Sequence, residues 1–223
     1  MRKEAVFICP HPITKLNSCS ICLLNIRSWN LHIEQFFSDT TLVANSSVLL
    51  FTETKTQNRS VKKISDFSDS WKAEHDDSTH GLAICYNTTK VKNVEKTTSW
   101  GHITMLSLLM TINEERVLLV LVYRPPGPST RNVFAQTLKM ELSFLQGNIS
   151  ETNYRTLVVG DFNMPGSYDV LNEALPPKTY HQRSQFSTHT RGGILDLVFD
   201  NRLSDPVEWM PTPYSDHFIL IFN

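Results

Sequence analysis

The chain has 223 residues, of which 40% are hydrophobic and 19% are charged, so it can bury a sizeable core and is not wholly disordered. Its formal net charge of −1 at pH 7 excludes a globally basic nucleic-acid coat, although an enzyme that acts on nucleic acid needs only a local positive field. The longest apolar run, 117–122, is far shorter than the roughly 20 residues of a membrane span, and Pro10 ends the short apolar stretch 5–9, so neither a transmembrane segment nor a cleaved signal peptide is predicted.

Short apolar runs predict the secondary structure in chain order. The polar segment 54–80 is expected to form loops or an exposed helix, 113–115 a hairpin turn, and Gly147 the C-cap of the long helix. Neighbouring strand pairs with helices between them favour two stacked sheets with outer helices. No repeat or linker divides the chain, so 1–223 is expected to be a single domain. The expected strands are 21–25, 48–52, 82–86, 103–112, 116–123, 156–159, 194–199 and 218–222, and the expected helices are 29–37, about 130–146 and 167–175.

The four cysteines are too few for a disulfide scaffold in a chain of this size. Cys19 and Cys22 have the spacing of a metal-binding pair, but the surrounding residues indicate a buried strand and no second pair completes a zinc site. We therefore interpret these cysteines as core residues with reduced thiols, which favours an intracellular protein.

Polar residues occur where the predicted strands end, as listed here: Asn25, Glu53, Tyr123, Asp161, Asn163, Asp196, Ser215, Asp216 and His217. Carboxylates and amides at the mouths of several strands converge when the strands share a sheet, which is how α/β scaffolds commonly build a site. Each residue also has an ordinary structural interpretation, such as a solvated strand end, a turn cap or a satisfied strand histidine. Asp196 is the exception, because an ionisable group among Ile194, Leu195, Leu197 and Val198 needs a partner if it is buried.

The chemistry of these residues suits a divalent metal and a phosphate. Glu53 offers a hard oxygen ligand of the kind that Mg²⁺ or Mn²⁺ prefers. Asp161 could orient or deprotonate a water, Asn163 could donate to an oxyanion, and His217 could contact the same phosphate, with Asp196 or Asp216 fixing its tautomer. This combination predicts phosphodiester hydrolysis.

Six segments in this order resemble the endonuclease/exonuclease/phosphatase superfamily, most closely the apurinic-type endonuclease domain of non-LTR (LINE-type) retrotransposons. The resemblance covers nearly the whole chain, about 19–223, and implies a DNase I-like four-layer α/β/β/α sandwich with two mostly antiparallel sheets, outer helices and a site at one edge. The segments are 24–28 (LNIRS), 52–54 (TET), 122–126 (VYRPP), 160–163 (GDFN), 188–197 (THTRGGILDL) and 214–217 (YSDH).

The same resemblance implies a role for each site residue. It implies an Mg²⁺ site at Glu53, assisted by Asn25 and Asp216, with Mn²⁺ as a substitute. It implies that Asp161 positions the attacking water, Asn163 stabilises the pentacovalent phosphate, Tyr123 contacts the phosphate, and His217 pairs with Asp196. The implied contacts to the substrate are Arg124, Arg191 and Ser215.

One departure from the pattern bears on the activity. Repair-type relatives carry an acidic residue two positions after the first asparagine, where this chain has Arg27, which is closer to the retrotransposon pattern. The expected activity is Mg²⁺-dependent nicking of DNA, and abasic-site activity is left open. The sequence stops soon after 215–217, so a free-standing domain without a reverse transcriptase is expected, nuclear if it acts on genomic DNA. DNA is the expected partner, and no membrane or obligate protein partner is predicted. The alternatives are a metal-dependent phosphomonoesterase of the same superfamily and a non-catalytic remnant that binds DNA or protein.

Overall fold

A computed structural model describes residues 20–223, except 58–60, 77, 128–130 and 167. Cys19, and the residues 129 and 130 that were expected to cap the long helix, lie outside the described residues. Among the helices that the structure describes, none is both long and apolar enough to cross a membrane.

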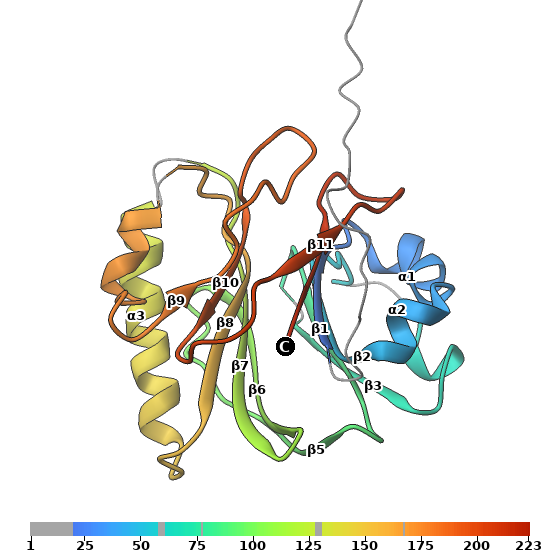
Figure 1. The fold of residues 1–223 in the computed structure, drawn as a ribbon, viewed down its shortest axis with the longest axis horizontal. Helices are drawn as coiled ribbons and strands as arrows, with labels where there is room; N and C mark the ends of the chain where they lie inside the picture. Colours follow the sequence, from blue (N-terminus) through green and yellow to red (C-terminus); the bar gives the residue numbers. More distant parts are fainter. Residues whose placement is uncertain (1–19, 58–60, 77, 128–130, 167) are drawn as a thin grey trace, which may run out of the picture.

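Two six-stranded sheets stack face to face, and helices cover their outer faces (Figure 1). The first sheet has the order β11-β12-β1-β2-β4-β3, and the second has the order β5-β6-β7-β8-β10-β9. Helices α1 and α2 lie outside the first sheet, and α3 lies outside the second. Only the β1–β2 and β7–β8 pairs are parallel among the described strands. The predicted four-layer α/β/β/α sandwich is therefore confirmed.

The bounds of the elements follow. The strands are β1 (Ser20–Asn25), β2 (Ser46–Thr52), β3 (Trp71–Asp76), β4 (Leu82–Asn87), β5 (Val91–Lys96), β6 (Thr104–Ile112), β7 (Glu115–Tyr123), β8 (Arg155–Asp161), β9 (His181–Gln182), β10 (Asp196–Asp200), β11 (Glu208–Met210) and β12 (Ile219–Phe222). The helices are α1 (Trp29–Phe37), α2 (Thr40–Asn45) and α3 (Arg131–Asn148), with short 3₁₀ turns at Ile64–Asp66 and Tyr168–Glu173.

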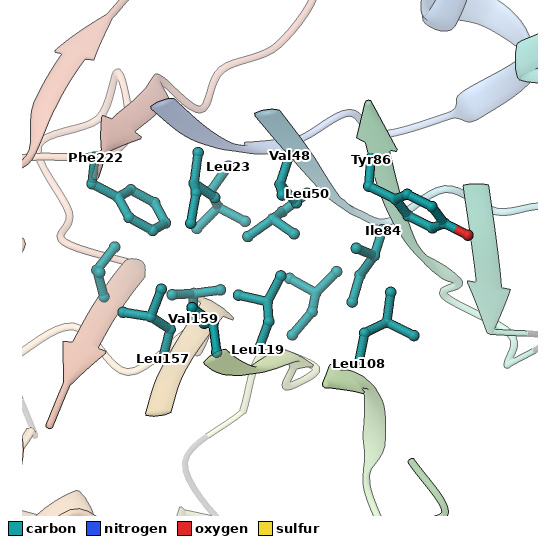
Figure 2. Close-up of a cluster of buried hydrophobic side chains, with 14 of the residues drawn as sticks. Leu23, Val48, Leu50, Ile84, Tyr86, Leu108, Leu119, Leu157, Val159 and Phe222 are labelled. Carbon is teal, nitrogen blue, oxygen red and sulfur yellow. The ribbon is translucent and has the colours of Figure 1, made fainter. Parts of the chain in front are cut away.

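The main core lies between the two sheets. Figure 2 shows Leu23, Leu50 and Ile84 of the first sheet facing Leu119 and Val159 of the second, all fully buried. Two further apolar clusters fill the spaces between each sheet and its outer helices. Because both faces of the central strands are covered, these strands consist of nearly continuous apolar residues, and their ends are the places where polar side chains can reach solvent.

The sequence predicted eight strands, and the part of the chain that the structure describes forms twelve. The four missed strands, β3, β5, β9 and β11, are the edge strands of the two sheets. Edge strands face solvent on one side and carry polar residues, as in 71–76 (WKAEHD) and 91–96 (VKNVEK). The expectation of loops or an exposed helix throughout 54–80 was therefore wrong for 71–76.

Smaller expectations had mixed outcomes. The hairpin turn between β6 and β7 is confirmed, with Asn113 and Glu114 both in left-handed conformations (φ 49° and 66°), as a two-residue hairpin loop requires. The C-cap assignment of Gly147 was wrong, because α3 continues to Asn148. Helix α2 was not predicted.

Cys22 is a buried β1 residue, and burial raises the pKa of its thiol to about 12, as expected for a core cysteine.

Candidate active site

The two parallel strand pairs bring polar residues to one edge of the sandwich. Asn25 ends β1 beside Thr52, the last residue of β2, and Glu53 follows directly. In the second sheet Tyr123 ends β7 opposite Asp161, the last residue of β8. The antiparallel strand β10 enters the same edge, with its first residue, Asp196, opposite Asp161. The convergence that the sequence predicted at the strand ends therefore occurs.

Asn25 links the acidic groups of the two sheets. Its Nδ2 donates to Glu53 Oε1 and to Asp161 Oδ2, both at 3.0 Å, while its Oδ1 accepts the backbone N–H of Arg27 at 3.1 Å. The Tyr123 hydroxyl donates to the same Glu53 oxygen at 3.3 Å. One buried amide therefore fixes the separation of two carboxylates whose strands belong to different sheets.

Glu53 is held as an ionised carboxylate. Burial acts to raise its pKa, but hydrogen bonds from Asn25, Lys55 and Tyr123 outweigh burial, and the pKa lies below the usual value. The Lys55 ammonium is 3.0 Å from the second oxygen, Oε2. Burial and the adjacent Glu53 raise the pKa of Tyr123, so this phenol remains a hydrogen-bond donor at neutral pH.

The oxygen donors of this edge suit a hard divalent cation. Glu53 and Asp216 are both partly exposed, and each already has a positive side chain on it, Lys55 on Glu53 and Arg27 on Asp216 at 2.9 Å. Carboxylate oxygens are the ligands that Mg²⁺ and Mn²⁺ prefer, and Asn25 links Glu53 to a further carboxylate at Asp161. The Oδ1 of Asn25 points to the Arg27 amide, so in this structure Asn25 orients the carboxylates.

Asp161 and Asn163 form a compact turn after β8. Asp161 is 1% exposed, and burial, together with the charge of Asp196, raises the pKa of its carboxyl. The backbone N–H of Asn163 donates a hydrogen bond to Asp161 Oδ1 at 3.1 Å, and Asn163 adopts a left-handed conformation (φ 47°). Its Nδ2 donates to the Arg124 carbonyl at 2.8 Å. A carboxyl with a raised pKa beside a positioned amide suits proton transfer near neutral pH.

His217 and Asp196 form a buried pair, with Nδ1 of the imidazole 2.8 Å from Asp196 Oδ2. Burial acts to lower the pKa of His217, but the Asp196 carboxylate outweighs burial, and that pKa is raised to about 9. The opposite ring nitrogen, Nε2, lies 4.0 Å from Asp161 Oδ2. Asp196 is therefore the partner of the imidazole, and the alternative partner, Asp216, pairs with Arg27. The hydroxyl of Thr188 accepts the Asp196 N–H at 3.0 Å and holds the start of β10.

The three predicted substrate contacts differ in position. The Ser215 hydroxyl donates to the Asn25 carbonyl at 2.7 Å, and so joins the His217 segment to β1. Arg191 is exposed on the loop before β10. Arg124 is only 1% exposed, and its guanidinium donates to the carbonyls of Asn163 and Gly127. The predicted contact between Arg124 and DNA is therefore corrected, because this buried cation supports the loop of Asn163.

His189 lies in the candidate site, although no role was predicted for it. Its ring packs edge-on against His217 at 4.9 Å between centroids, and its backbone pairs with that of His217. Its Nδ1 accepts the Arg191 N–H at 3.0 Å, so the neutral ring carries its proton on Nε2, which lies 3.3 Å from Asp216 Oδ2. His189, Asp216 and His217 are close enough to surround an ion, but this tautomer leaves Nε2 of His189 without a lone pair for a metal.

Arg27 and Lys55 were also given no role in the site. A common spacing is the signal that could have found them, because each basic residue lies two positions after a predicted metal ligand, Asn25 or Glu53. His189 lies within the segment 188–197 that carries the family resemblance, but nothing in its sequence neighbours indicates contact with Asp216.

The fold agrees with the comparisons. The chain belongs to the Endonuclease/Exonuclease/phosphatase family, whose sequence model matches residues 22–217. Members of this family typically hydrolyse phosphodiesters or phosphate esters with the help of divalent metals. No curated protein matches the sequence.

Several solved structures share the fold at low identity. A mannosyl-6-phosphatase of Bacteroides thetaiotaomicron is 12% identical, with a TM-score of 0.67 over 92% of this chain and 99% of that one. An AP endonuclease from Archaeoglobus fulgidus is 13% identical, with a TM-score of 0.66 over 91% and 98%. TDP2 of D. rerio, complexed with a single-strand DNA product, is 13% identical, with a TM-score of 0.61 over 92% and 97%. These similarities establish the fold, and the substrate has to be inferred from the site.

Proposed function

We propose that this protein is a Mg²⁺-dependent endonuclease that hydrolyses DNA phosphodiester bonds and nicks one strand, and that it derives from the endonuclease domain of a LINE-type retrotransposon. The observation that carries the proposal is the Asn25 bridge, which joins Glu53, directly after β2 of the first sheet, to Asp161 of the second sheet. Asp161 lies beside His217, whose pair with Asp196 also connects the two sheets. The side chains proposed as acid, base and metal ligand therefore lie close together.

The proposed roles follow from the geometry. Asp161 accepts a proton from the attacking water, for which the raised pKa of its carboxyl is suited. Water oxygen bonds to phosphorus as the bond to the leaving ester oxygen breaks. His217, kept cationic by Asp196, faces the phosphoryl oxygens through Nε2, and the Nδ2 of Asn163 donates to the same developing charge. Asp196 positions His217 and keeps its charge.

Glu53 and Asp216 would hold the metal, with Asn25 orienting Glu53. When bound, the metal supplies Lewis-acid stabilisation of the phosphoryl charge. The hydroxyl of Tyr123, already directed to Glu53, would contact the phosphate beside it.

A polar head-group substrate finds less support. A cavity of about 380 Å³ beside Tyr123 is lined by Ile103, Pro125, Pro126 and Val133, among other residues. Most of the exposed lining is apolar, although His102, Thr104 and Thr137 also line it, whereas a sugar or inositol is bound by several convergent polar groups. The exposed cations Arg27, Lys55 and Arg191 suit a polyanion instead.

A nicking assay on supercoiled plasmid tests the proposal directly. The parent should nick the plasmid with Mg²⁺ and stop when the metal is chelated, and Glu53→Gln should be much slower at limiting Mg²⁺. Glu34→Gln, which changes an exposed glutamate of α1 paired with Lys62, is the matched control and should behave as the parent. Turnover of a sugar or inositol phosphate without DNA cleavage would favour the phosphomonoesterase, and absence of both activities would favour a binding remnant.

A further inference from the structure

Two exposed cations lie on the acidic residues that would hold the metal. Lys55 Nζ is 3.0 Å from Glu53 Oε2, and Arg27 Nη1 is 2.9 Å from Asp216 Oδ1. The lysine and arginine side chains are 43% and 52% exposed. Exposed ion pairs of this kind contribute little stability, because water competes for both partners and long side chains lose entropy when they are held. Each cation can therefore leave its carboxylate at small cost.

The two cations lie shortly after the ends of the parallel strands β1 and β2, which pair side by side. Arg27 lies two residues after Asn25, and Lys55 lies two residues after Glu53. Both adopt left-handed backbone conformations, with φ of 60° and 52°. Glycine or asparagine is the usual residue in such a conformation, so a lysine and an arginine are uncommon there.

Asn25 lies between the two cations. Its Oδ1 accepts the Arg27 N–H, and its Nδ2 donates to Glu53, which in turn pairs with Lys55. A divalent cation that binds Glu53 and Asp216 repels both positive side chains from those carboxylates. Both side chains are largely exposed, so once displaced they can reach an anionic ligand.

We propose that Lys55 and Arg27 are exchangeable counter-ions, which occupy Glu53 and Asp216 before the metal binds and then contact the DNA phosphates that flank the scissile one. This inference rests on the proposed endonuclease function and adds the residues that read the polyanion. It predicts opposite effects of removing either charge, because metal binding loses a competitor while DNA binding loses a contact.

The variants Lys55→Met and Arg27→Met test the inference, since methionine keeps an unbranched apolar side chain without the charge. Lys62→Met is the matched control, because Lys62 is a 42% exposed lysine that pairs with Glu34 of α1 at 3.1 Å. Calorimetric titration with Mg²⁺, without DNA, should show affinity raised about two- to fivefold in each site variant, as expected for loss of one exposed ion pair. The control should match the parent.

DNA affinity is measured with the same charges removed in a His217→Ala background, which prevents turnover, at fixed Mg²⁺ and varied salt. Each site variant should bind a short duplex more weakly and lower the slope of log affinity against log salt by about 0.9, the effect of one lost phosphate contact. Misfolding would weaken both metal and DNA binding, so only the opposite changes support the inference.

The outcomes separate this inference from the proposed function. Normal plasmid nicking by the parent, with unchanged Mg²⁺ affinity or an unchanged salt slope in both site variants, would overturn the inference and leave the function standing. No Mg²⁺ binding and no nicking by the parent would overturn both.

Discussion

Gly160, at the edge that carries the candidate active site, is the glycine whose added Cβ would make the closest contact. It precedes Asp161 in β8 and pairs with Val122 of β7. A Cβ built on Gly160 would lie 1.8 Å from the Val122 carbonyl oxygen and 2.8 Å from the carbonyl carbon, both backbone atoms in the centre of a sheet. Its φ of 147° is also one that residues with a side chain rarely adopt. Gly160→Ala therefore requires β7 and β8 to separate or the chain to change conformation.

The cost can be estimated from these two terms. A residue held in a glycine-only region costs of order 1–3 kcal/mol, and a methyl group forced into a packed site costs about 1–3 kcal/mol more. We expect Gly160→Ala to lower the free energy of unfolding by about 4 kcal/mol, a large part of the roughly 5–15 kcal/mol of an ordinary domain. Nicking activity should fall as well, because the same shift moves Asp161 away from Asn25.

Urea unfolding followed by tryptophan fluorescence measures this difference. Gly147→Ala is the matched control, because Gly147 is exposed within α3 and its added Cβ meets nothing within 4 Å. This control should stabilise the protein by about 0.5–1 kcal/mol, as alanine does in place of a helical glycine. A Gly160→Ala protein within about 1 kcal/mol of the parent would refute the close approach of β7 and β8 at this residue.

Three further predictions follow from other contacts. Asp196→Asn and His217→Ala should each slow nicking by about 10²–10⁴-fold, and the double variant should be little slower than the worse single, because the two residues act as one unit. Asp200→Asn should lower the free energy of unfolding by about 3–5 kcal/mol, because it leaves Arg155, bonded at 3.1 Å and 2.5 Å, without its buried carboxylate. Burial acts to raise the pKa of Asp200, but those bonds lower it, so the stabilisation should be present above pH 3.8 and lost as pH falls through the folded-state pKa. Arg191→Ala should weaken DNA binding equally across sequences, measured by fluorescence anisotropy, since a phosphate contact carries no base information.

Each of these predictions has a contrary result. Fully additive rate effects would mean that Asp196 and His217 work independently. Unfolding midpoints in urea that fall equally with pH in the parent and in Asp200→Asn would remove the linkage assigned to that carboxylate. A change in the preferred cleavage sequence of Arg191→Ala would indicate a base contact.

The strands that could be predicted from the sequence are those whose residue pattern is determined by burial. The eight internal strands were recognised because both faces of each are covered, so residues such as those of 117–122 are uniformly apolar. The edge strands were missed because their pattern is set by a neighbouring strand and by water. The ladder that orders 71–76 is made with β4, and nothing in the local residues specifies that partner.

The candidate site also has residues that the sequence predicts and residues that it does not. Strand-end residues such as Glu53 and Asp161 were predicted because the strands before them were predicted. The role of Arg124 was not predicted, because a sequence motif shows that a cation is present but does not show whether that cation is buried. The pairing of His189 with Asp216 depends on two loops that meet only in the folded chain, and on an Nδ1 that accepts the Arg191 N–H.

The neighbouring positions of β1 and β12 fix when this site can exist during synthesis. Ser215 and Asn25, joined by a hydrogen bond, lie 190 residues apart in the chain, and His217 follows shortly afterwards. At about 5–20 residues per second, the ribosome needs roughly 10–40 s to make the residues between them. During that interval β1 has no β12 beside it and the site lacks His217, so the proposed active site can be complete only after residue 217 has been made.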